Sequence, residues 1–147
     1  MKAQGLEARM QGHIEYRNDG AAGIVRIKGS GLWSVAMIEE HFGELKAMLS
    51  ALREQGKAVR VLVDMSGAAV QPPEVAAVIR TATQDIYEPG DRIAMIVGST
   101  LAKMQMRRLV DNDVMKLFVS AQASENWLRA YEPVDRAERQ ASMGGRR

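Results

Sequence analysis

The chain has 147 residues, of which 46% are hydrophobic and 26% are charged, and this predicts one globular domain with a buried core. With 20 basic and 18 acidic residues the formal net charge is +2, which is too small to indicate nucleic acid as a partner. Cysteine is absent, which excludes disulfides and thiolate chemistry and suits a cytoplasmic protein. No apolar run approaches the roughly 18–20 residues of a membrane span, so we expect neither a transmembrane segment nor a secretory signal.

The first part of the chain predicts a β-hairpin after a short lead-in. Residues 1–12 are polar and contain glycine, so we expect them to be flexible. His13–Arg17 alternates polar and apolar side chains, which is typical of an edge strand. Asn18-Asp19-Gly20 is a turn signal, and Gly23–Gly29 is the expected second strand of the hairpin.

A long amphipathic helix is expected after the hairpin. Ser34 can cap its start, and Gly56 can end it after about Gln55. One face carries an apolar stripe at helical spacing, which consists of Ile38, Phe42, Leu45, Leu49 and Leu52. Gly43 costs this helix about 1 kcal/mol relative to alanine. We interpret Gly43 as a point of close packing on the sheet.

The centre of the chain predicts a strand, a turn and a helix in succession. Val59–Asp64 has a continuously apolar core, which is typical of a strand that is buried on both faces. We expect a turn at Ser66-Gly67 next. A helix then begins near Pro72 or Pro73, because proline fits the first helical turn.

The remaining sequence repeats this alternation after a break at Pro89-Gly90-Asp91. The expected elements are a strand over Arg92–Gly98, a helix capped by Ser99 or Thr100 and running to about Val110, a strand over Met115–Val119, and a helix that opens at Ser120 or Ala121 and contains Trp127 and Tyr131. Residues 132–147 are polar, and we expect a mobile tail. The order β-β-α-β-α-β-α-β-α predicts a single α/β domain over residues 13–131, with a mixed sheet, parallel inner strands and helices packed on it.

Three segments carry a family resemblance: Arg60–Gly67, Asp91–Gly98, and Met115–Val119 with the following Ala123 to Trp127-Leu128. In this order they resemble the SpoIIAA-like branch of the STAS-type domains, whose strand ends in Asp-Leu-Ser-Gly and which is named after a sporulation anti-sigma-factor antagonist. The resemblance covers roughly residues 13–131 and implies a SpoIIAA-like fold and a role in bacterial regulation. The chain also resembles, more remotely, the lipid-binding CRAL-TRIO group.

The chain departs from this family in the segment after the central strand. Phosphorylation-switched antagonists of the superfamily carry Asp-Ser-Ser-Gly there, whereas this chain has Gln71-Pro72-Pro73-Glu74, which offers no hydroxyl to a kinase. The carboxylate of Glu74 also has less charge and fewer acceptor oxygens than a phosphoserine. We therefore expect no phosphorylation switch at these residues.

Candidate binding residues follow two of the expected strands, where ligands and partners usually meet an α/β sheet. They are Asp64, Ser66 and Gly67 after the third strand, Glu74 at the next helix, and Gly98, Ser99 and Thr100 after the fourth strand. Asp64 could orient a ligand or a partner's amide groups, or could simply bind backbone N–H groups in the turn. The segment from Gly98 to Thr100 could bind an anion at the start of its helix, or could act only as a helix cap.

Little in the sequence supports catalysis. His13 and His41 are the two histidines, and without cysteine a zinc site lacks the ligands that it needs. A triad could be drawn only from Ser66, His41 and Asp64, but Ser66 and Asp64 are too near in sequence to take different corners easily. We therefore predict that the protein is not an enzyme and that it has no cofactor and no metal.

The sequence thus predicts a non-catalytic, cytoplasmic regulatory or protein-interaction module that binds a protein partner or forms a homodimer. The alternative is a domain that binds a small molecule or a lipid, in a pocket near the C-terminal ends of the strands. The ten methionines suit either core filling or a pliable binding surface. A broad exposed apolar patch would favour the protein partner, and an apolar cavity of several hundred Å³ would favour the ligand.

Overall fold

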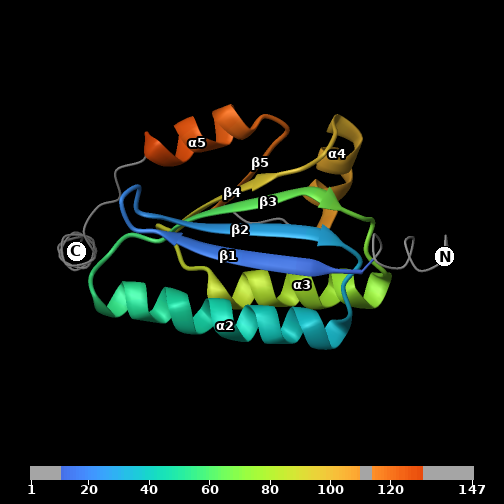
Figure 1. Ribbon diagram of the computed structural model, residues 1–147, viewed down its shortest axis with the longest axis horizontal. Helices are drawn as coiled ribbons and strands as arrows, with labels where there is room; N and C mark the ends of the chain where they lie inside the picture. Colours follow the sequence, from blue (N-terminus) through green and yellow to red (C-terminus); the bar gives the residue numbers. More distant parts are fainter. Residues whose placement is uncertain (1–10, 110–113, 131–147) are drawn as a thin grey trace, which may run out of the picture.

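Nine elements make up the part of the chain that the computed structural model describes, residues 11–109 and 114–130. In chain order they are β1 (His13–Asp19), β2 (Ile24–Gly31), α2 (Val35–Glu54), β3 (Arg60–Ala68), α3 (Pro73–Ile86), β4 (Arg92–Ile96), α4 (Thr100–Leu109), β5 (Met115–Phe118) and α5 (Ala121–Arg129), as Figure 1 shows. This is the predicted order of strands and helices. Some of the predicted features lie outside the described residues. They are most of the expected lead-in over 1–12, the helix residues Val110 and Tyr131, and the expected tail over 132–147.

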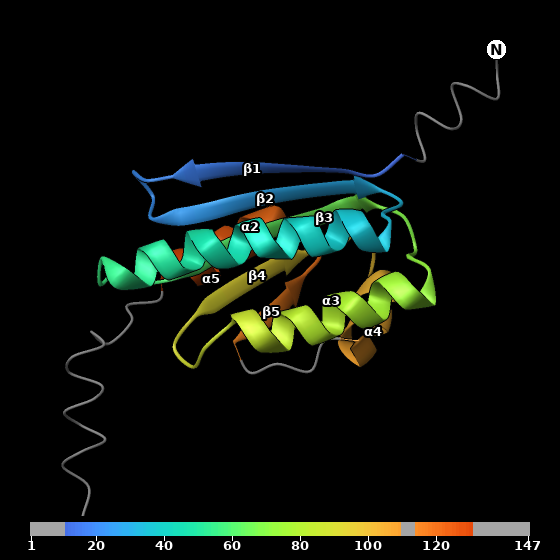
Figure 2. The ribbon, with the colours of Figure 1, turned by 90° about the horizontal axis from the view of Figure 1, so that it is seen from below.

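The five strands form one mixed sheet in the order β1-β2-β3-β4-β5. β1 is antiparallel to β2, and the remaining neighbours are parallel. Because parallel crossovers are right-handed and each one here moves to the next strand in the same direction, α2, α3 and α4 lie on one face of the sheet. Figure 2 shows α2 and α3 in front of the sheet and α5 behind it, and Ala102 and Met106 of α4 pack against the same apolar cluster as α2. The predicted mixed α/β sheet with parallel inner strands is confirmed.

The strands contribute alternate side chains to two apolar layers. Val61 and Val63 pack in one cluster with Leu45 and Leu49 of α2. Leu62 lies on the opposite face and packs with Leu128 of α5 and its neighbours. The inner strands are continuously apolar because helices cover both of their faces. The strand residues predicted to be buried are all buried, namely Val61, Leu62, Val63, Ala94, Ile96 and Leu117.

Local signals set the ends of two helices as predicted. The hydroxyl of Ser34 accepts a hydrogen bond from the backbone N–H of Met37 at 3.1 Å, which caps the start of α2. Gly56 follows the end of α2 with a φ of +71°, a conformation that glycine adopts without strain. Ser120 caps α5 in the same manner, through the backbone N–H of Ala123 at 3.2 Å.

Gly43 does not pack against the sheet, so that interpretation was wrong. The residue is exposed, and a Cβ atom added to it would meet no atom within 4 Å. The buried side of α2 is formed by Ile38, Leu45 and Leu49, and Gly43 lies on the part of the helix that faces solvent. The cost of this glycine is therefore not offset by a close helix–sheet contact.

β3 runs on to Ala68, so the prediction of a turn at Ser66-Gly67 is wrong. β2 extends to Gly31, and after a register shift Gly67 and Ala68 pair with Ser30 and Gly31. The local sequence pattern predicts a turn here, but the neighbouring strand β2 provides hydrogen-bond partners for the backbone of this segment, so the strand continues. The chain leaves the sheet only at residues 69–72.

Other strand ends also differ from the predicted ones. β1 continues through Asn18 and Asp19 because β2 is paired with it up to that point, and the turn follows at residues 20–23. Gly23 in this turn has a φ of +69°. β4 and β5 end slightly earlier than predicted, at Ile96 and Phe118.

The loop between α3 and β4 is tied to the last turn of α2. α3 begins at Pro73, as predicted, and ends at Ile86. In the following loop the buried carboxylate of Asp91 accepts hydrogen bonds from Nη2 of Arg53 at 2.5 Å and from the backbone N–H of Glu88 at 2.8 Å. The same Arg53 nitrogen donates to the carbonyl of Ile86 at 2.9 Å. One guanidinium therefore holds the ends of two helices together.

Candidate functional site

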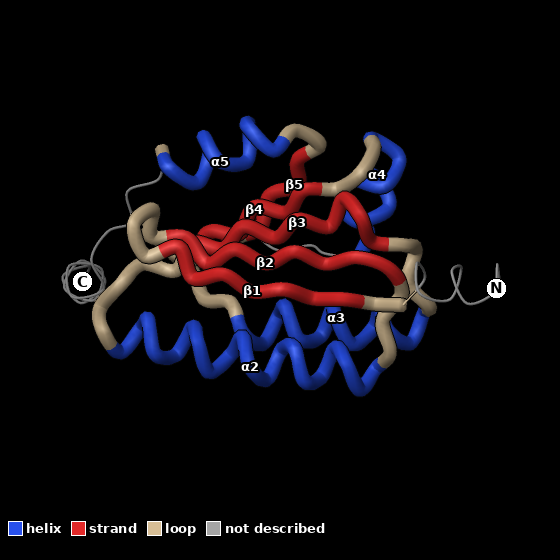
Figure 3. The backbone as a smooth tube through the Cα atoms, in the orientation of Figure 1, coloured by secondary structure: helices blue, strands red, loops and turns tan. Residues whose placement is uncertain are grey.

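A pocket of about 300 Å³ lies at the C-terminal ends of β3 and β4, beside α3 and α4. In Figure 3 the loops that leave these two strands lie at the same end of the sheet. The wall is mainly apolar, and among the described residues its polar side chains come from Ser66, Gln71 and Ser99. The apolar side chains are Met65, Ala68, Ala69, Val70, Ala76, Ile79, Met95, Val97, Ala102 and Met106. We call this hollow the outer pocket; its volume is at the lower end of the range for small-molecule sites, about 300–1,000 Å³.

The structure brings part of the predicted site together at this pocket. Ser66, Gly98 and Ser99 line it. Asp64 and Gly67 lie close to Ser66 in β3 but do not line the pocket. Glu74 lies in the first turn of α3 and Thr100 is the first residue of α4; both are exposed and outside the lining.

The Asp64 carboxylate is used locally. Its Oδ1 atom accepts a hydrogen bond from the backbone N–H of Ser66 at 3.0 Å and another from the Ser66 hydroxyl at 2.6 Å. This is the backbone-binding alternative for Asp64, although the backbone N–H group that it binds lies in a strand and not in a turn. The hydroxyl of Ser66 is thereby oriented at the edge of the outer pocket.

The Gly98-Ser99-Thr100 segment has the geometry of a helix cap. The Ser99 hydroxyl accepts from the backbone N–H of Ala102 at 3.0 Å and so occupies one of the free donors at the start of α4. Gly98 lets β3 and β4 approach each other, because a Cβ atom there would lie 3.1 Å from the carbonyl oxygen of Ser66. The two halves of the predicted site are therefore in direct contact through their backbones.

Gln71 is a structural residue of the site that the sequence pattern did not reveal. Its Nε2 atom donates to the carbonyls of Gly31 at 2.9 Å and Ala69 at 2.7 Å, and its Oε1 atom accepts from the backbone N–H of Trp33 at 2.9 Å. This amide fastens the rim of the outer pocket to the end of β2. No local signal identifies such a residue, because its partners Gly31 and Trp33 lie far away in the sequence.

Large apolar side chains are exposed on two of the segments that line the outer pocket. Val70, at the rim of the outer pocket, is 84% exposed, and Leu101 and Met104 of α4 are 66% and 57% exposed. Exposed apolar side chains that form a contiguous patch are typical of a surface that meets a partner. No sequence pattern separates these residues from buried ones.

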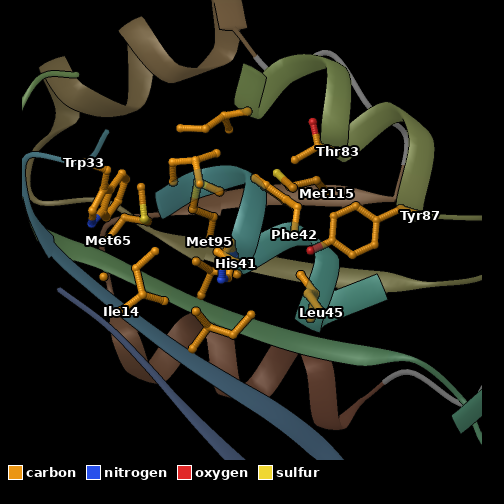
Figure 4. A pocket seen from close by; sticks show the side chains of 15 residues that line it. Ile14, Trp33, His41, Phe42, Leu45, Met65, Thr83, Tyr87, Met95 and Met115 are labelled. Atoms are coloured by element: carbon orange, nitrogen blue, oxygen red, sulfur yellow. The ribbon is translucent and has the colours of Figure 1, made fainter. Parts of the chain in front are cut away.

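A second hollow, of about 50 Å³, lies between the sheet and the helices α2 and α3, and we call it the inner cavity. Figure 4 shows Trp33 and Met65 towards one end of it and Tyr87 and Leu45 towards the other. Nε1 of Trp33 is buried and has no hydrogen-bond partner among the described residues. Met65, Ile79 and Met95 line both the inner cavity and the outer pocket.

His41 contributes a polar side chain to the inner cavity, and its surroundings keep it neutral. Burial lowers the pKa of His41 from its ordinary value of 6.5 to about 4. Its ring is stacked on that of Tyr16, with the centroids 5.2 Å apart, and Nδ1 is hydrogen-bonded to the Tyr16 hydroxyl. Burial also raises the pKa of Tyr16, so both rings are uncharged near neutral pH.

In the described part of the chain, the residues considered for a catalytic triad or a metal site do not come together. Ser66 is bound to Asp64, whereas His41 is bound to Tyr16, so these three residues do not form a triad. His13 pairs with Glu15 on the surface. No group of three or more histidine, aspartate or glutamate side chains that could hold a metal ion occurs in the described part of the chain. None of the described helices is long and apolar enough to cross a membrane.

Comparison with known proteins identifies the fold. No family model and no curated protein matches the chain. A crystal structure of an anti-sigma factor antagonist from Mycobacterium paratuberculosis matches with a TM-score of 0.51 and 11% identity, over 81% of this chain and 95% of that one. An uncharacterized protein with a SpoIIAA-like fold from Shewanella loihica matches with a TM-score of 0.53 and 15% identity, over 80% and 93% of the two chains. The fold that the sequence resemblance implied is confirmed: the chain has a SpoIIAA-like fold.

Proposed function

We propose that the chain is a non-catalytic regulatory module that binds a protein partner at the C-terminal end of its sheet. The observation that carries this proposal is the exposure of Val70 at the rim of the outer pocket and of Leu101 and Met104 on α4, the helix whose Ala102 and Met106 line that pocket. The fold that the chain shares with an anti-sigma factor antagonist supports the same function. The site needs no chemical step for this role, since binding requires only apolar area and a few oriented polar groups.

Regulation of this module does not use phosphorylation at residues 71–74. None of Gln71, Pro72, Pro73 and Glu74 has a hydroxyl group. The Gln71 amide is fully engaged with backbone groups of its neighbours, and Glu74 lies in the first turn of α3, where a negative charge stabilises the helix. Both side chains therefore have structural roles in this segment.

Site-specific photo-crosslinking in the cells of origin tests the proposal. A benzophenone side chain is introduced at Val70 or at Leu101, and in a control at Lys57, which is exposed at the opposite end of the sheet after α2. We expect Val70 and Leu101 to give an adduct with the same protein, and Lys57 to give none. Adducts of equal yield at all three positions, or none at Val70 and Leu101, would contradict the proposal.

The mass of the adduct identifies the class of partner. An adduct of twice the chain mass indicates a homodimer, and any other single mass indicates a different protein. Native mass spectrometry of the protein purified from its own cells then measures the same assembly without a crosslinker. A cytoplasmic location is part of this proposal, and the absence of cysteine is compatible with it.

A second candidate function is the binding of a small apolar molecule, and the outer pocket favours it specifically. Its volume of about 300 Å³, its apolar wall and the hydroxyls of Ser66 and Ser99 form the combination expected for a ligand site. Native mass spectrometry before and after denaturation would detect a retained molecule. A protein that carries no added mass and binds no apolar probe would contradict this second function.

A further inference from the structure

The outer pocket and the inner cavity are separated by a wall only one side chain thick. Met65 of β3, Met95 of β4 and Ile79 of α3 line both hollows. The two hollows are also flanked by further methionines, because Met106 lines the outer pocket and Met115 the inner cavity. Two of the three side chains in the shared wall are thus thioethers.

This composition makes the wall easy to displace. A methionine side chain has three rotatable bonds and no branch, so it changes its rotamer with little steric cost and fills irregular gaps. Met65 is only half-buried, and it precedes Ser66, which lines the outer pocket. Moving its thioether breaks no hydrogen bond. An apolar group that takes its place keeps the dispersion contacts of the wall.

The chemistry of the joined space defines the class of ligand. The Met65 side chain is itself an unbranched chain, so the passage that it vacates matches an alkyl chain in cross-section. In the inner cavity the Thr83 hydroxyl already donates to the carbonyl of Arg80 at 2.9 Å and His41 is bonded to Tyr16. Nε1 of Trp33 is a single N–H donor that has no partner among the described residues. The Ser66 and Ser99 hydroxyls lie at the outer pocket, where a polar end group of the ligand can reach them.

We propose that the two hollows open into one elongated site for an amphiphile with an unbranched alkyl chain. The polar end stays at Ser66 and Ser99, and the chain passes Met65 and Met95 into the space beside Met115. This inference rests on the second candidate function, because the ligand enters through the outer pocket. It goes further in naming the shape of the ligand and the methionines that admit it.

Methyl NMR of the full chain with 13C-labelled methionine tests the inference. The probes are 1-hexanol, 1-octanol, 1-decanol and 1-dodecanol. All four alcohols are expected to shift the methyl signal of Met106, whereas only the longer ones shift that of Met115. Met48 lines neither hollow and serves as the internal control. The dissociation constant should fall about fourfold for each added methylene along the whole series.

Variants separate the two parts of the site. Ala76→Leu narrows the outer pocket and should weaken the binding of every alcohol, whereas Ala77→Leu, on the exposed side of the same helix, should not. Val63→Ile adds a methylene beside the inner cavity and should weaken only the longer alcohols. Urea unfolding confirms that each variant is folded, and the Val63 variant keeps the test valid if Ala76→Leu does not fold.

The outcomes distinguish failure of the joined site from failure of the small-molecule function. If Met106 responds but Met115 stays silent and the affinity levels off with chain length, the joined site is overturned and the small-molecule function survives. If Met106 does not respond to any alcohol, both are overturned. Titration with phosphatidylcholine vesicles in a parallel arm shows whether an acyl chain presented by a membrane gives the Met115 shift as a free alcohol does.

Discussion

The side-chain amide of Gln71 bonds to the backbone N–H of Trp33 at 2.9 Å and so joins two connections that are far apart in the chain. Trp33 leads from β2 into α2, and Gln71 leads from β3 into α3. Its amide nitrogen completes the link through the carbonyls of Gly31 and Ala69. The rim of the outer pocket is therefore held by the Gln71 side chain in addition to the backbone bond from the N–H of Ala69 to the carbonyl of Gly31.

Gln71→Ala is expected to lower the free energy of unfolding by about 1–3 kcal/mol, because it leaves the Trp33 N–H and the Ala69 carbonyl without their partner and removes one of two donors to the Gly31 carbonyl. Urea titration measures the change. Gln122→Ala is the matched control, since Gln122 is exposed and bonds only to Asn126 among the described residues; its effect should stay within about 0.5 kcal/mol. Equal effects of the two substitutions would show that the Gln71 bonds do not stabilise the fold.

Asp91→Ala is expected to be among the more destabilising single changes, at about 3 kcal/mol. The side chains of Asp91 and Arg53 are 6% and 11% exposed, so the substitution removes the nearest carboxylate from a buried guanidinium and leaves it only the half-exposed Glu88 as an ion-pair partner among the described residues. The control is Asp85→Ala, which removes an ion pair with Lys46 whose side chains are 66% and 62% exposed and should cost at most about 1 kcal/mol. Thermal unfolding of the two variants in one buffer provides the comparison.

Stability should fall in mildly acidic solution because of His41. Its pKa is about 4 in the folded protein and about 6.5 in the unfolded chain, so between these values the unfolded state binds the proton more readily. His41 adds no pH dependence above pH 6.5, and the free energy of unfolding falls as the pH drops towards 4, by on the order of 3 kcal/mol.

Urea midpoints measured across this pH range test the assignment to His41. His41→Gln removes the titrating ring, and its stability should depend less steeply on pH between 6.5 and 4 than that of the wild type. His13→Gln is the control, because it removes the other histidine of the chain, which lies on the surface beside Glu15. An unaltered slope in His41→Gln would assign the acid sensitivity to other groups.

Gly43→Ala should stabilise the protein by about 0.5–1 kcal/mol, since the position is exposed, helical and free of neighbours within 4 Å of an added Cβ. Gly56→Ala should destabilise it, because Gly56 has a φ of +71° that an alanine adopts only with strain. Differential scanning calorimetry of both variants checks the opposite signs. A destabilised Gly43→Ala would mean that α2 is bent or packed differently at that position.

Asp64→Ala should cost about 0.5–2 kcal/mol, as expected when a carboxylate that accepts two local hydrogen bonds is removed. Asp64→Asn keeps the Oδ1 acceptor and should cost less. The Val70 crosslink of both variants reports whether the substitution also changes partner binding. If Asp64→Ala had wild-type stability and abolished a turnover found by substrate screening, the non-enzyme proposal would be wrong.

Much of the fold follows from interactions between residues that are close in sequence. The apolar runs around Val61–Val63 and Ile93–Ile96 predict strands covered on both faces, and the stripe through Ile38, Leu45 and Leu49 predicts one side of a helix. Ser34 and Ser120 cap helices because a cap needs only a hydroxyl three residues before its donor. Such features are visible in any short window of the sequence.

The candidate site was located by sequence and assembled by the tertiary structure. Ser66, Gly98 and Ser99 could be placed at one edge because the ends of parallel strands meet there. The extension of β3 to Ala68, the Gln71 bonds and the shared wall of Met65 and Met95 could not be predicted. Each depends on which backbone or side chain a distant segment brings alongside, and a local sequence pattern carries no information about that neighbour.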